Sequence, residues 1–327
     1  MSGLRLGFLG VGRIGRDRMT RILQSGIVDA AIICDASPDM IEETIKVTPQ
    51  AQVVASFDEL LERHIDGIVI ATPSALHAEQ SIKALERGVA VFCQKPLGRT
   101  KGEVADVVEV ARRSNRLLGV DLSYRYTAGM QKIRDIVRSG ELENVFAVDL
   151  VFHNAYGPDK AWFYDKALSG GGCVIDLGVH LVDLALWALD FPEVLNVQSA
   201  LFSQGSPIRD ADQVEDFAVA TIELATGTVV RLTCSWRLSA GCDAVIGASF
   251  YGTGGGLEFR NIEGSFHNFS AERYRGTMRE LLVSPPDDWA GRAAINWAKQ
   301  LSGGGKFDEA SESFVTVAAV LDAIYAR

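Results

Sequence analysis

Two residues that can move protons, Asp176 and His180, lie four positions apart in an otherwise apolar segment. On a helix this spacing puts both side chains on one face, and Asp183 follows three positions later. A buried carboxylate and a buried imidazole each need a hydrogen-bond partner or a ligand, because burial without one is costly. The carboxylate can orient the ring and stabilise its charged form, which suits acid–base chemistry. A purely structural Asp–His pair fits the same pattern.

Three glycines at positions 170–172 precede this acidic and basic pair. Glycine lets a backbone approach another group closely. The run therefore predicts that the start of the helix lies against a bound ligand.

A lysine, Lys95, follows the apolar run 90–93 and the neutral Gln94, and it precedes Pro96. If the run is a parallel strand, Lys95 stands at the carboxyl edge of a sheet, where ligands bind in open α/β folds. There its charge can lower the pKa of a reacting hydroxyl and stabilise a developing oxyanion. A solvated surface lysine is the alternative interpretation.

The glycine-rich stretch GVGRIG spans residues 10–15 and fits G-x-G-x-x-G. It follows an apolar strand, opens a helix and precedes Asp35 by twenty residues, which together form the dinucleotide-binding fingerprint. Gly10 allows the tight turn, Gly12 lets a pyrophosphate approach, and Gly15 lets the helix pack on the strand. A structural turn in another α/β fold is the alternative.

Asp35 favours NAD over NADP, because its charge accepts ribose hydroxyls and repels a 2′-phosphate. The next residues, 36–38, offer no arginine to hold that phosphate. The remaining residues expected at the cofactor are Arg13, Ile14, Thr72, Pro73, His77, Gln94 and Lys95. An exposed arginine at a helix start is the alternative for Arg13, and a structural histidine is the alternative for His77.

Polar and aromatic side chains upstream of the three glycines suit a polyhydroxylated ring. Aromatic faces cover C–H surfaces, whereas amide and phenol groups pair with hydroxyls. The expected substrate contacts are Arg125, Asn154, Tyr156 and Trp162. For each of them ordinary packing is the alternative.

Residues 1–121 read as alternating short apolar strands and amphipathic helices, which predicts a doubly wound parallel sheet covered on both faces. The expected strands are residues 5–9, 30–34, 52–55, 67–70, 90–93 and 117–120. The expected helices are residues 14–25, 38–47, 57–62, 75–87 and 101–113.

Residues 122–327 show a different rhythm. The expected elements are helix 128–138, strand 145–152, helix 173–189, long strands over 196–259 and terminal helices at 288–301 and 309–326. This order predicts a second, α+β domain with an open, mostly antiparallel sheet and helices on one face. The fold class is thus α/β followed by α+β, with predicted domains 1–121 for the dinucleotide and 122–327 for substrate and oligomerisation.

Composition excludes several partners. With 327 residues and a formal net charge of −10, the chain lacks the basic excess that nucleic-acid binding needs. The longest apolar helix candidate, 173–189, is interrupted by Asp176, His180 and Asp183, so no membrane partner is expected. The five cysteines are scattered without zinc spacing, which predicts reduced thiols in a cytoplasmic protein and no metal site.

Taken together, these motifs resemble the glucose–fructose oxidoreductase / inositol dehydrogenase / MocA family. The resemblance rests on the fingerprint at 10–15, ATP-x-x-x-H at 71–77, Lys95-Pro96, and GGG-x-x-x-D-x-G-x-H at 170–180. It implies a Rossmann domain and a catalytic set of Lys95, Asp176 and His180. In that set His180 is the acid/base, Asp176 holds it or a neighbouring hydroxyl, and Lys95 binds the reacting oxygen. One departure is Gln94, where the family usually has Glu.

The resemblance implies an NAD(H)-dependent oxidoreductase acting on a secondary alcohol or ketone of a sugar, cyclitol or sugar derivative. The alternatives are a sugar-nucleotide or dihydrodiol substrate on the same fold, or a non-catalytic dinucleotide-binding regulator. In VATIEL (219–224) and VVRLTCSW (229–236) both alternating faces carry apolar residues. This predicts a homodimer or homotetramer built through the second-domain sheet.

Overall fold

The chain forms two compact units in a computed structural model that describes residues 3–210 and 212–326. Unit 1 contains the chain up to Ser123 together with Ala290–Val315. Unit 2 contains Tyr124–Trp289 and the chain from Thr316 onward. The segment that includes the first of the two expected terminal helices therefore belongs with unit 1, and the second helix runs from unit 1 into unit 2.

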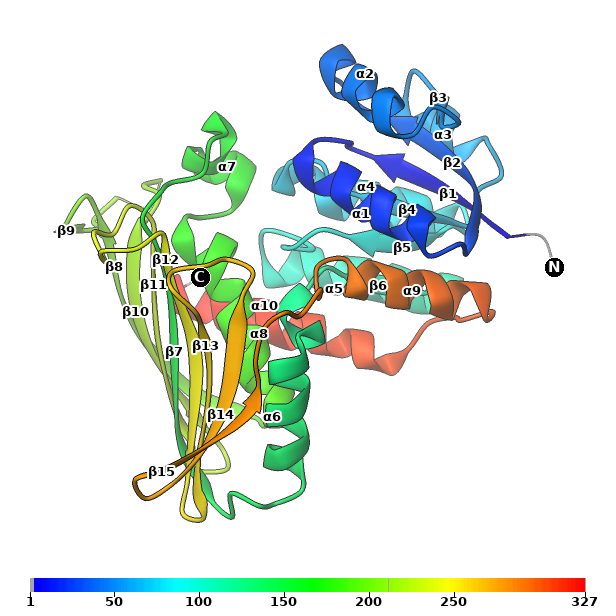
Figure 1. The fold of residues 1–327 in the computed structure, drawn as a ribbon. Coiled ribbons are helices and arrows are strands. Elements are labelled where there is room, and N and C mark those ends of the chain that lie inside the picture. The colour runs from blue at the N-terminus through cyan, green and yellow to red at the C-terminus, as the bar shows by residue number, and fades with distance from the viewer. Residues whose placement is uncertain (1–2, 211, 327) are drawn as a thin grey trace. The chain divides into compact units, whose positions relative to one another are not determined.

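Unit 1 is built on a six-stranded, wholly parallel sheet with the order β3-β2-β1-β4-β5-β6 (Figure 1). Its strands are β1 (Leu4–Leu9), β2 (Val28–Cys34), β3 (Gln52–Val53), β4 (Gly67–Ile70), β5 (Ala90–Cys93) and β6 (Leu118–Val120). Its helices are α1 (Arg13–Gln24), α2 (Pro38–Val47), α3 (Phe57–Leu61), α4 (Ser74–Glu86), α5 (Lys101–Ser114) and α9 (Arg292–Ser302), with a short turn η4 (Glu309–Ser311). The strand order reverses between β1 and β4, and ligands of doubly wound sheets bind at such a point. The predicted doubly wound fold is confirmed.

Helices cover both faces of this sheet, so its central strands are buried throughout and need only apolar residues. Helix α9 comes from far along the chain and lays Trp297 on the sheet. A Cβ on Gly67 or Gly119 would collide with the Trp297 ring. The two glycines thus let a late helix close the core of unit 1.

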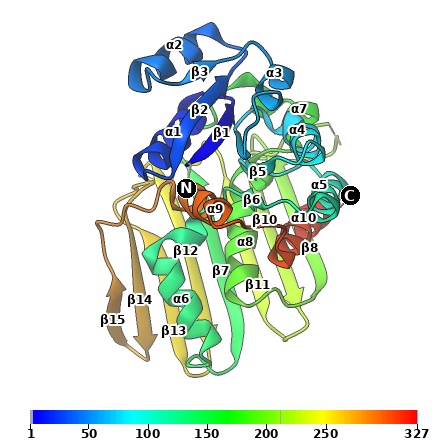
Figure 2. The same ribbon diagram turned by 90° about the vertical axis from the view of Figure 1, so that its right-hand side faces the viewer.

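Unit 2 is built on a nine-stranded sheet with the order β15-β14-β13-β12-β7-β11-β10-β8-β9 (Figure 2). Its strands are β7 (Val145–Asn154), β8 (Val194–Ser203), β9 (Ser206–Pro207), β10 (Phe217–Leu224), β11 (Val229–Ser235), β12 (Ala244–Gly252), β13 (Gly255–Asn261), β14 (Phe269–Arg275) and β15 (Met278–Val283). Its helical segments are η1 (Ser123–Tyr126), α6 (Ala128–Arg138), η2 (Ala161–Tyr164), α7 (Lys166–Ser169), η3 (Val174–Gly178), α8 (Val179–Ala188) and most of α10 (Glu312–Ile324). Only β7 and β11 pair in parallel, which confirms the mostly antiparallel sheet.

Helices α6 and α8 pack on one face of this sheet, α6 over β13–β15 and α8 over β7, β11 and β12. The strands accordingly alternate between buried and partly exposed residues. The stretch Lys166–Ala188 is long and apolar enough to cross a membrane by composition, but 94% of its most apolar window is buried inside the protein. It is the core helix of unit 2.

Candidate active site

The glycine fingerprint turns β1 into α1 at the carboxyl edge of the unit 1 sheet. Gly10 has a φ of +83°, and a Cβ there would come within 2.6 Å of the Ala71 carbonyl oxygen. A Cβ on Gly15 would overlap the Gly10 carbonyl, so these two glycines serve the protein's own packing. Gly12 differs, because a Cβ there would meet no atom within 4 Å. The open space at Gly12 is where a ligand can approach the backbone.

The start of helix α1 offers its N–H groups to that space. Gly12 is the N-cap and supplies no side chain, and the first turn holds no acidic residue. A helix N-terminus without its own carboxylate suits a pyrophosphate, since the N–H groups and the dipole favour an anion. Arg13 and Ile14 both lie in this first turn. These residues fit the dinucleotide that the fingerprint predicts.

Asp35 follows the last residue of β2 and supports the same loop. Its Oδ2 accepts from Val11 N at 2.7 Å, and its Oδ1 accepts from Ser37 N at 2.8 Å. Each carboxylate oxygen retains a second lone pair, which a ribose hydroxyl can use.

His77 lies on α4 and is only 2% exposed. Its Nδ1 is 2.6 Å from the Pro96 carbonyl oxygen and its Nε2 is 2.7 Å from the Thr72 carbonyl oxygen. Burial lowers the pKa of this imidazole, the two hydrogen bonds oppose that shift, and the charge of Lys95 lowers the pKa further. His77 thus ties together the loops after β4 and β5, which gives it a structural role there.

In unit 2 the acid–base pair lies at an irregular helix start. Asp176 falls in η3, a turn of π-helix, and His180 falls in the first turn of α8. The predicted helix 173–189 therefore contains a π-turn, and π-turns of this kind are frequent at functional sites. Asp176 Oδ2 accepts a hydrogen bond from Trp236 Nε1 at 3.1 Å.

Tyr124 joins Asp176 and His180. The His180 ring is 8% exposed and stands edge-on to the Tyr124 ring, with centroids 4.9 Å apart. Burial raises the pKa of Tyr124, and the negative charge of Asp176 adds to this shift. A half-buried acid, a buried imidazole and a buried phenol therefore lie together in unit 2.

The glycines before this cluster lie against the protein itself, not against space for a ligand. A Cβ on Gly171 would strike the Tyr325 hydroxyl, and one on Gly172 would strike the Glu215 carbonyl. The Glu215 carboxylate accepts from Gly172 N and Val174 N, both at 2.9 Å, and from the Tyr325 hydroxyl at 2.6 Å. The expectation that Gly171 and Gly172 approach a ligand is wrong, because Glu215 and Tyr325 fill that space.

The four residues expected to contact the substrate have different partners and different degrees of exposure. Arg125 is bound by both carboxylate oxygens of the buried Asp183, with a 2.7 Å contact from Nε. Tyr156 is 56% exposed and donates to Asp243 at 2.5 Å, whereas Asn154 Oδ1 accepts from Tyr156 N. Trp162 stacks on Phe163 with ring centroids 3.8 Å apart. Arg125 therefore has a structural partner, while Tyr156 keeps an exposed ring.

Two sequence profiles of one family match this chain. Residues 4–122 match an oxidoreductase family with an NAD-binding Rossmann fold, and residues 130–258 match the GFO/IDH/MocA C-terminal domain. The two matches follow each other in order and together cover most of the chain. The chain belongs to the GFO/IDH/MocA oxidoreductase family. It is thus an NAD-binding oxidoreductase, and the family, fold class and cofactor predicted from the sequence are confirmed.

Named relatives of this GFO/IDH/MocA protein act on sugars and cyclitols. D-glucoside 3-dehydrogenase of Escherichia coli (strain K12) is 26% identical over 86% of this chain and 82% of its own length. Inositol 2-dehydrogenase of Rhodococcus erythropolis is 29% identical over 68% of this chain and 63% of its own length. A structure of levoglucosan dehydrogenase with NADH and levoglucosan superposes with a TM-score of 0.83 and 20% identity, covering 99% of this chain and 96% of that chain. This last likeness shows the shared fold.

Sequence reasoning missed three charged residues of this GFO/IDH/MocA protein. Glu215 follows no motif, and it becomes important only because the loop before β10 meets the glycine run. Arg18 and Asp121 are both buried in unit 1 and form an ion pair. The sequence pattern offered two indications of this pair. Arg18 is a charged residue on the apolar face of the first helix, and Asp121 directly follows an apolar strand.

Proposed function

We propose that this chain transfers a hydride between NAD(H) and a secondary alcohol or ketone of a sugar, cyclitol or related polyol. The observation that carries the proposal is the cluster in unit 2 of the half-buried Asp176 with the buried His180 and Tyr124. A non-catalytic dinucleotide-binding regulator has no need of an acid and an imidazole that both lie beside the same phenol.

His180 is the acid/base that takes the proton from the substrate hydroxyl during oxidation and returns it during reduction. Asp176, held by Trp236, orients the imidazole or a neighbouring hydroxyl. Lys95 binds the reacting oxygen and stabilises its negative charge. When bound, the nicotinamide supplies or accepts the hydride at C4.

We assign the dinucleotide to residues 1–121 and the substrate to residues 122–327. The residues that hold the cofactor are Gly12, Arg13, Ile14, Asp35, Thr72, Pro73, Gln94 and Lys95, and Gly10 and Gly15 shape the loop that binds it. His77 acts indirectly, by fixing the Thr72 and Pro96 carbonyls. The Asp35 carboxylate favours NAD over NADP through its charge.

A polyhydroxylated substrate suits the segment before the glycine run. Asn154 and Tyr156 offer an amide and a phenol, and Trp162 offers an aromatic face. The names of the E. coli and Rhodococcus relatives indicate the same substrate class, a glucoside and inositol. Arg125 drops out of this set because Asp183 engages its guanidinium.

The test is NAD⁺ reduction with a panel of aldoses, glucosides and cyclitols, using the wild type, Lys95→Ala and His180→Ala. Turnover by the wild type, with about a hundredfold or larger loss in kcat in both variants, supports the proposal. NADH binding followed by fluorescence should stay within about threefold in His180→Ala, which lies outside the residues assigned to the cofactor. Equal turnover in wild type and variants would refute the roles of Lys95 and His180. Tight NADH binding without turnover on any polyol would favour the regulator.

A homodimer or homotetramer through the unit 2 sheet completes the proposal, with the cytoplasm as its location. The face of the sheet opposite α6 and α8 exposes Val219 and Tyr251 by 39% and 37%. It also carries the Arg231–Asp149 ion pair. Light scattering after gel filtration should give two or four chain masses, and a stable monomer would contradict the assembly.

A further inference from the structure

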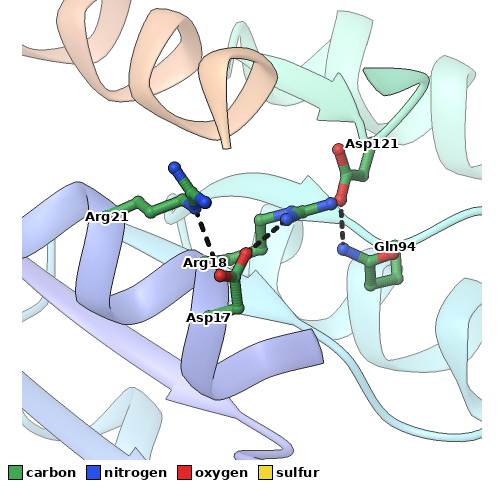
Figure 3. A network of polar contacts seen from close by, with 5 residues as sticks. All are labelled: Asp17, Arg18, Arg21, Gln94 and Asp121. Atoms are coloured by element: carbon green, nitrogen blue, oxygen red, sulfur yellow. Dashed lines mark hydrogen bonds and ion pairs between the residues drawn. The ribbon is translucent and has the colours of Figure 1, made fainter. Parts of the chain in front are cut away.

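A line of alternating charges runs from helix α1 to the carboxyl edge of the unit 1 sheet (Figure 3). Arg21 Nε donates to Asp17 at 3.1 Å, and Arg18 donates to Asp17 at 2.5 Å. Arg18 Nε also donates to Asp121 Oδ2 at 2.6 Å, and the Gln94 amide donates to the same oxygen. The line thus ends on a neutral residue next to Lys95.

The inner part of this line is buried, since Arg18 is 8% and Asp121 is 1% exposed. Burial alone would lower the pKa of the Arg18 guanidinium. The charges of Asp121 and Asp17 and the hydrogen bonds to them outweigh burial, and they raise its pKa. Arg18 is therefore cationic wherever the protein is folded, and Asp121 supplies the buried countercharge.

The Asp121 carboxylate fixes which way the Gln94 amide points. An ionised carboxylate only accepts hydrogen bonds, so the amide must turn its Nε2 toward Asp121. The Gln94 carbonyl oxygen is then directed away from the ion pair. A Glu at position 94 would bring a second carboxylate to hydrogen-bond distance of the first, with one guanidinium for both. The neutral amide that replaces the usual Glu of the family thus has a physical reason.

The backbone around Lys95 is held on both sides. Before it, Gln94 N donates to the Ile70 carbonyl oxygen at 2.8 Å, and the Gln94 side chain is bound by Asp121. After it, the Pro96 carbonyl oxygen lies 2.6 Å from His77 Nδ1. Side-chain anchors therefore flank the residue whose amine must be placed accurately.

We propose that Arg18 and Asp121 are positioning residues for Lys95, and that they act by fixing the Gln94 amide and hence the turn after β5. This inference rests on the proposed function, in which Lys95 binds the reacting oxygen. Asp121, and not residue 94, then carries the negative charge at this part of the sheet edge.

The incomplete pairing of Asp121 supports a role beyond stability. Asp121 Oδ1 is buried and accepts no hydrogen bond from any residue that the structure describes. An unsatisfied buried carboxylate oxygen costs free energy, and apolar residues of similar volume often replace a buried ion pair without loss of stability. Stability alone therefore does not explain why this ion pair is present.

The experiment compares three variants of the full chain with the wild type. Arg18→Met with Asp121→Leu replaces the ion pair by apolar side chains and leaves Gln94 without its anchor. Asp121→Asn is the conservative variant, because its amide oxygen still accepts from Arg18 and Gln94. Asp17→Asn is the matched control, since it removes a carboxylate from the other side of Arg18 without touching Gln94. Each is measured for melting temperature, NADH dissociation constant, kcat and KM.

We expect the apolar double variant to melt within about 5 °C of the wild type. Its kcat should fall by about 10–100-fold, because a small displacement of a catalytic group has effects of this size. Its NADH dissociation constant should change by less than about threefold. The kcat of Asp121→Asn should stay within about fivefold of the wild-type value, and that of Asp17→Asn should stay within about twofold. A double variant that keeps wild-type kcat would overturn the inference, as would one whose kcat loss merely follows a loss of folded protein.

An exchange of charge between Gln94 and Asp121 gives a second, independent test. Gln94→Glu alone should lower both kcat and the melting temperature, because two carboxylates then face each other. Gln94→Glu with Asp121→Asn restores one negative charge and one amide, and both quantities should recover. No recovery would overturn the inference. If instead Lys95→Ala keeps full turnover, the proposed function itself fails, whatever these variants do.

Discussion

Two glycine-rich segments open helices in this protein, and they use the glycines for opposite purposes. At residues 10–15, the space beside Gly12 is open, and the helix start provides neither a side-chain cap nor an acidic residue. At residues 170–172, the space beside Gly172 is filled by Glu215, whose carboxylate sits on the helix N–H groups. The first helix N-terminus has no acidic side chain of the protein on it and suits an anionic ligand. The second helix N-terminus is bound by the carboxylate of Glu215.

A run of glycines in a sequence has two possible structural causes. Glycine indicates that something lies close to the backbone, but it does not indicate whether that group is a ligand or the protein. The distinction came from where a Cβ would go and from which acid faces the helix start. Four substitutions test whether the two segments differ in this way.

Gly172→Ala should have the greatest consequence. Its Cβ would overlap the backbone carbonyl of Glu215, which cannot move away without disturbing β10. We expect a loss of about 3 kcal/mol or more in the free energy of unfolding, as for other overpacked sites. Denaturant unfolding measures it. Gly102→Ala in α5 is the control, because the nearest atom to its Cβ is 3.7 Å away; an equal loss there would show that any added methyl group is harmful.

Glu215→Gln should lower the free energy of unfolding by about 1–3 kcal/mol. Its amide nitrogen would face backbone N–H groups that now donate to the carboxylate. Burial raises the pKa of Glu215, against the hydrogen bonds from Tyr325, Val174 and Gly172. A raised pKa means that the stability contributed by this group is complete below about pH 4 and declines as pH rises through the folded pKa.

The free energy of unfolding of the wild type should therefore fall as the pH rises above about 4. Glu215→Gln should lack the part of this fall that comes from residue 215. Asp183, whose pKa burial also raises, contributes equally to both proteins and cancels. Unfolding free energies measured from pH 4 to pH 8 decide the matter. Parallel curves for the two proteins would mean that Glu215 does not titrate in this range.

Gly12→Ala should leave folding unchanged and weaken the cofactor. The φ of −61° at Gly12 accommodates alanine, and no atom lies within 4 Å of the added methyl group. We expect about a tenfold rise in the NADH dissociation constant, equal to about 1.4 kcal/mol, with the melting temperature within about 2 °C. Fluorescence titration and thermal unfolding measure the two quantities. Unchanged NADH affinity would mean that the open space is not used by the dinucleotide.

Tyr325→Phe should have the mildest effect, about 1 kcal/mol, because it removes a single hydrogen bond to Glu215. That bond lowers the pKa of Glu215, so its loss should raise this pKa further. The decline in stability with pH should therefore extend to higher pH than in the wild type. A curve shifted to lower pH would contradict the assignment of Tyr325 as donor.

Much of unit 1 was predictable from the sequence because its elements are local. The expected strands 67–70 and 90–93 coincide with β4 and β5, and helix 38–47 coincides with α2. A strand buried on both faces must be apolar throughout, and its helices need one apolar face, so the pattern is clear. In unit 2, β14 and β15 were missed, because partly exposed strands with several charged residues lack that pattern.

The chemical types at the site follow from the amino-acid sequence: a lysine after one strand, an acid and a histidine four apart, and a glycine loop followed by an aspartate. These depend on spacing along the chain, which short-range geometry converts directly into position. The groups that lie against each of these residues come from distant parts of the chain and depend on how it folds. Asp121 meets Arg18 and Gln94, Glu215 meets the glycine run, and Trp236 meets Asp176, across separations of tens of residues. Burial makes such contacts selective, because an unpaired polar group in the core is expensive, and no local pattern encodes which distant residue satisfies it.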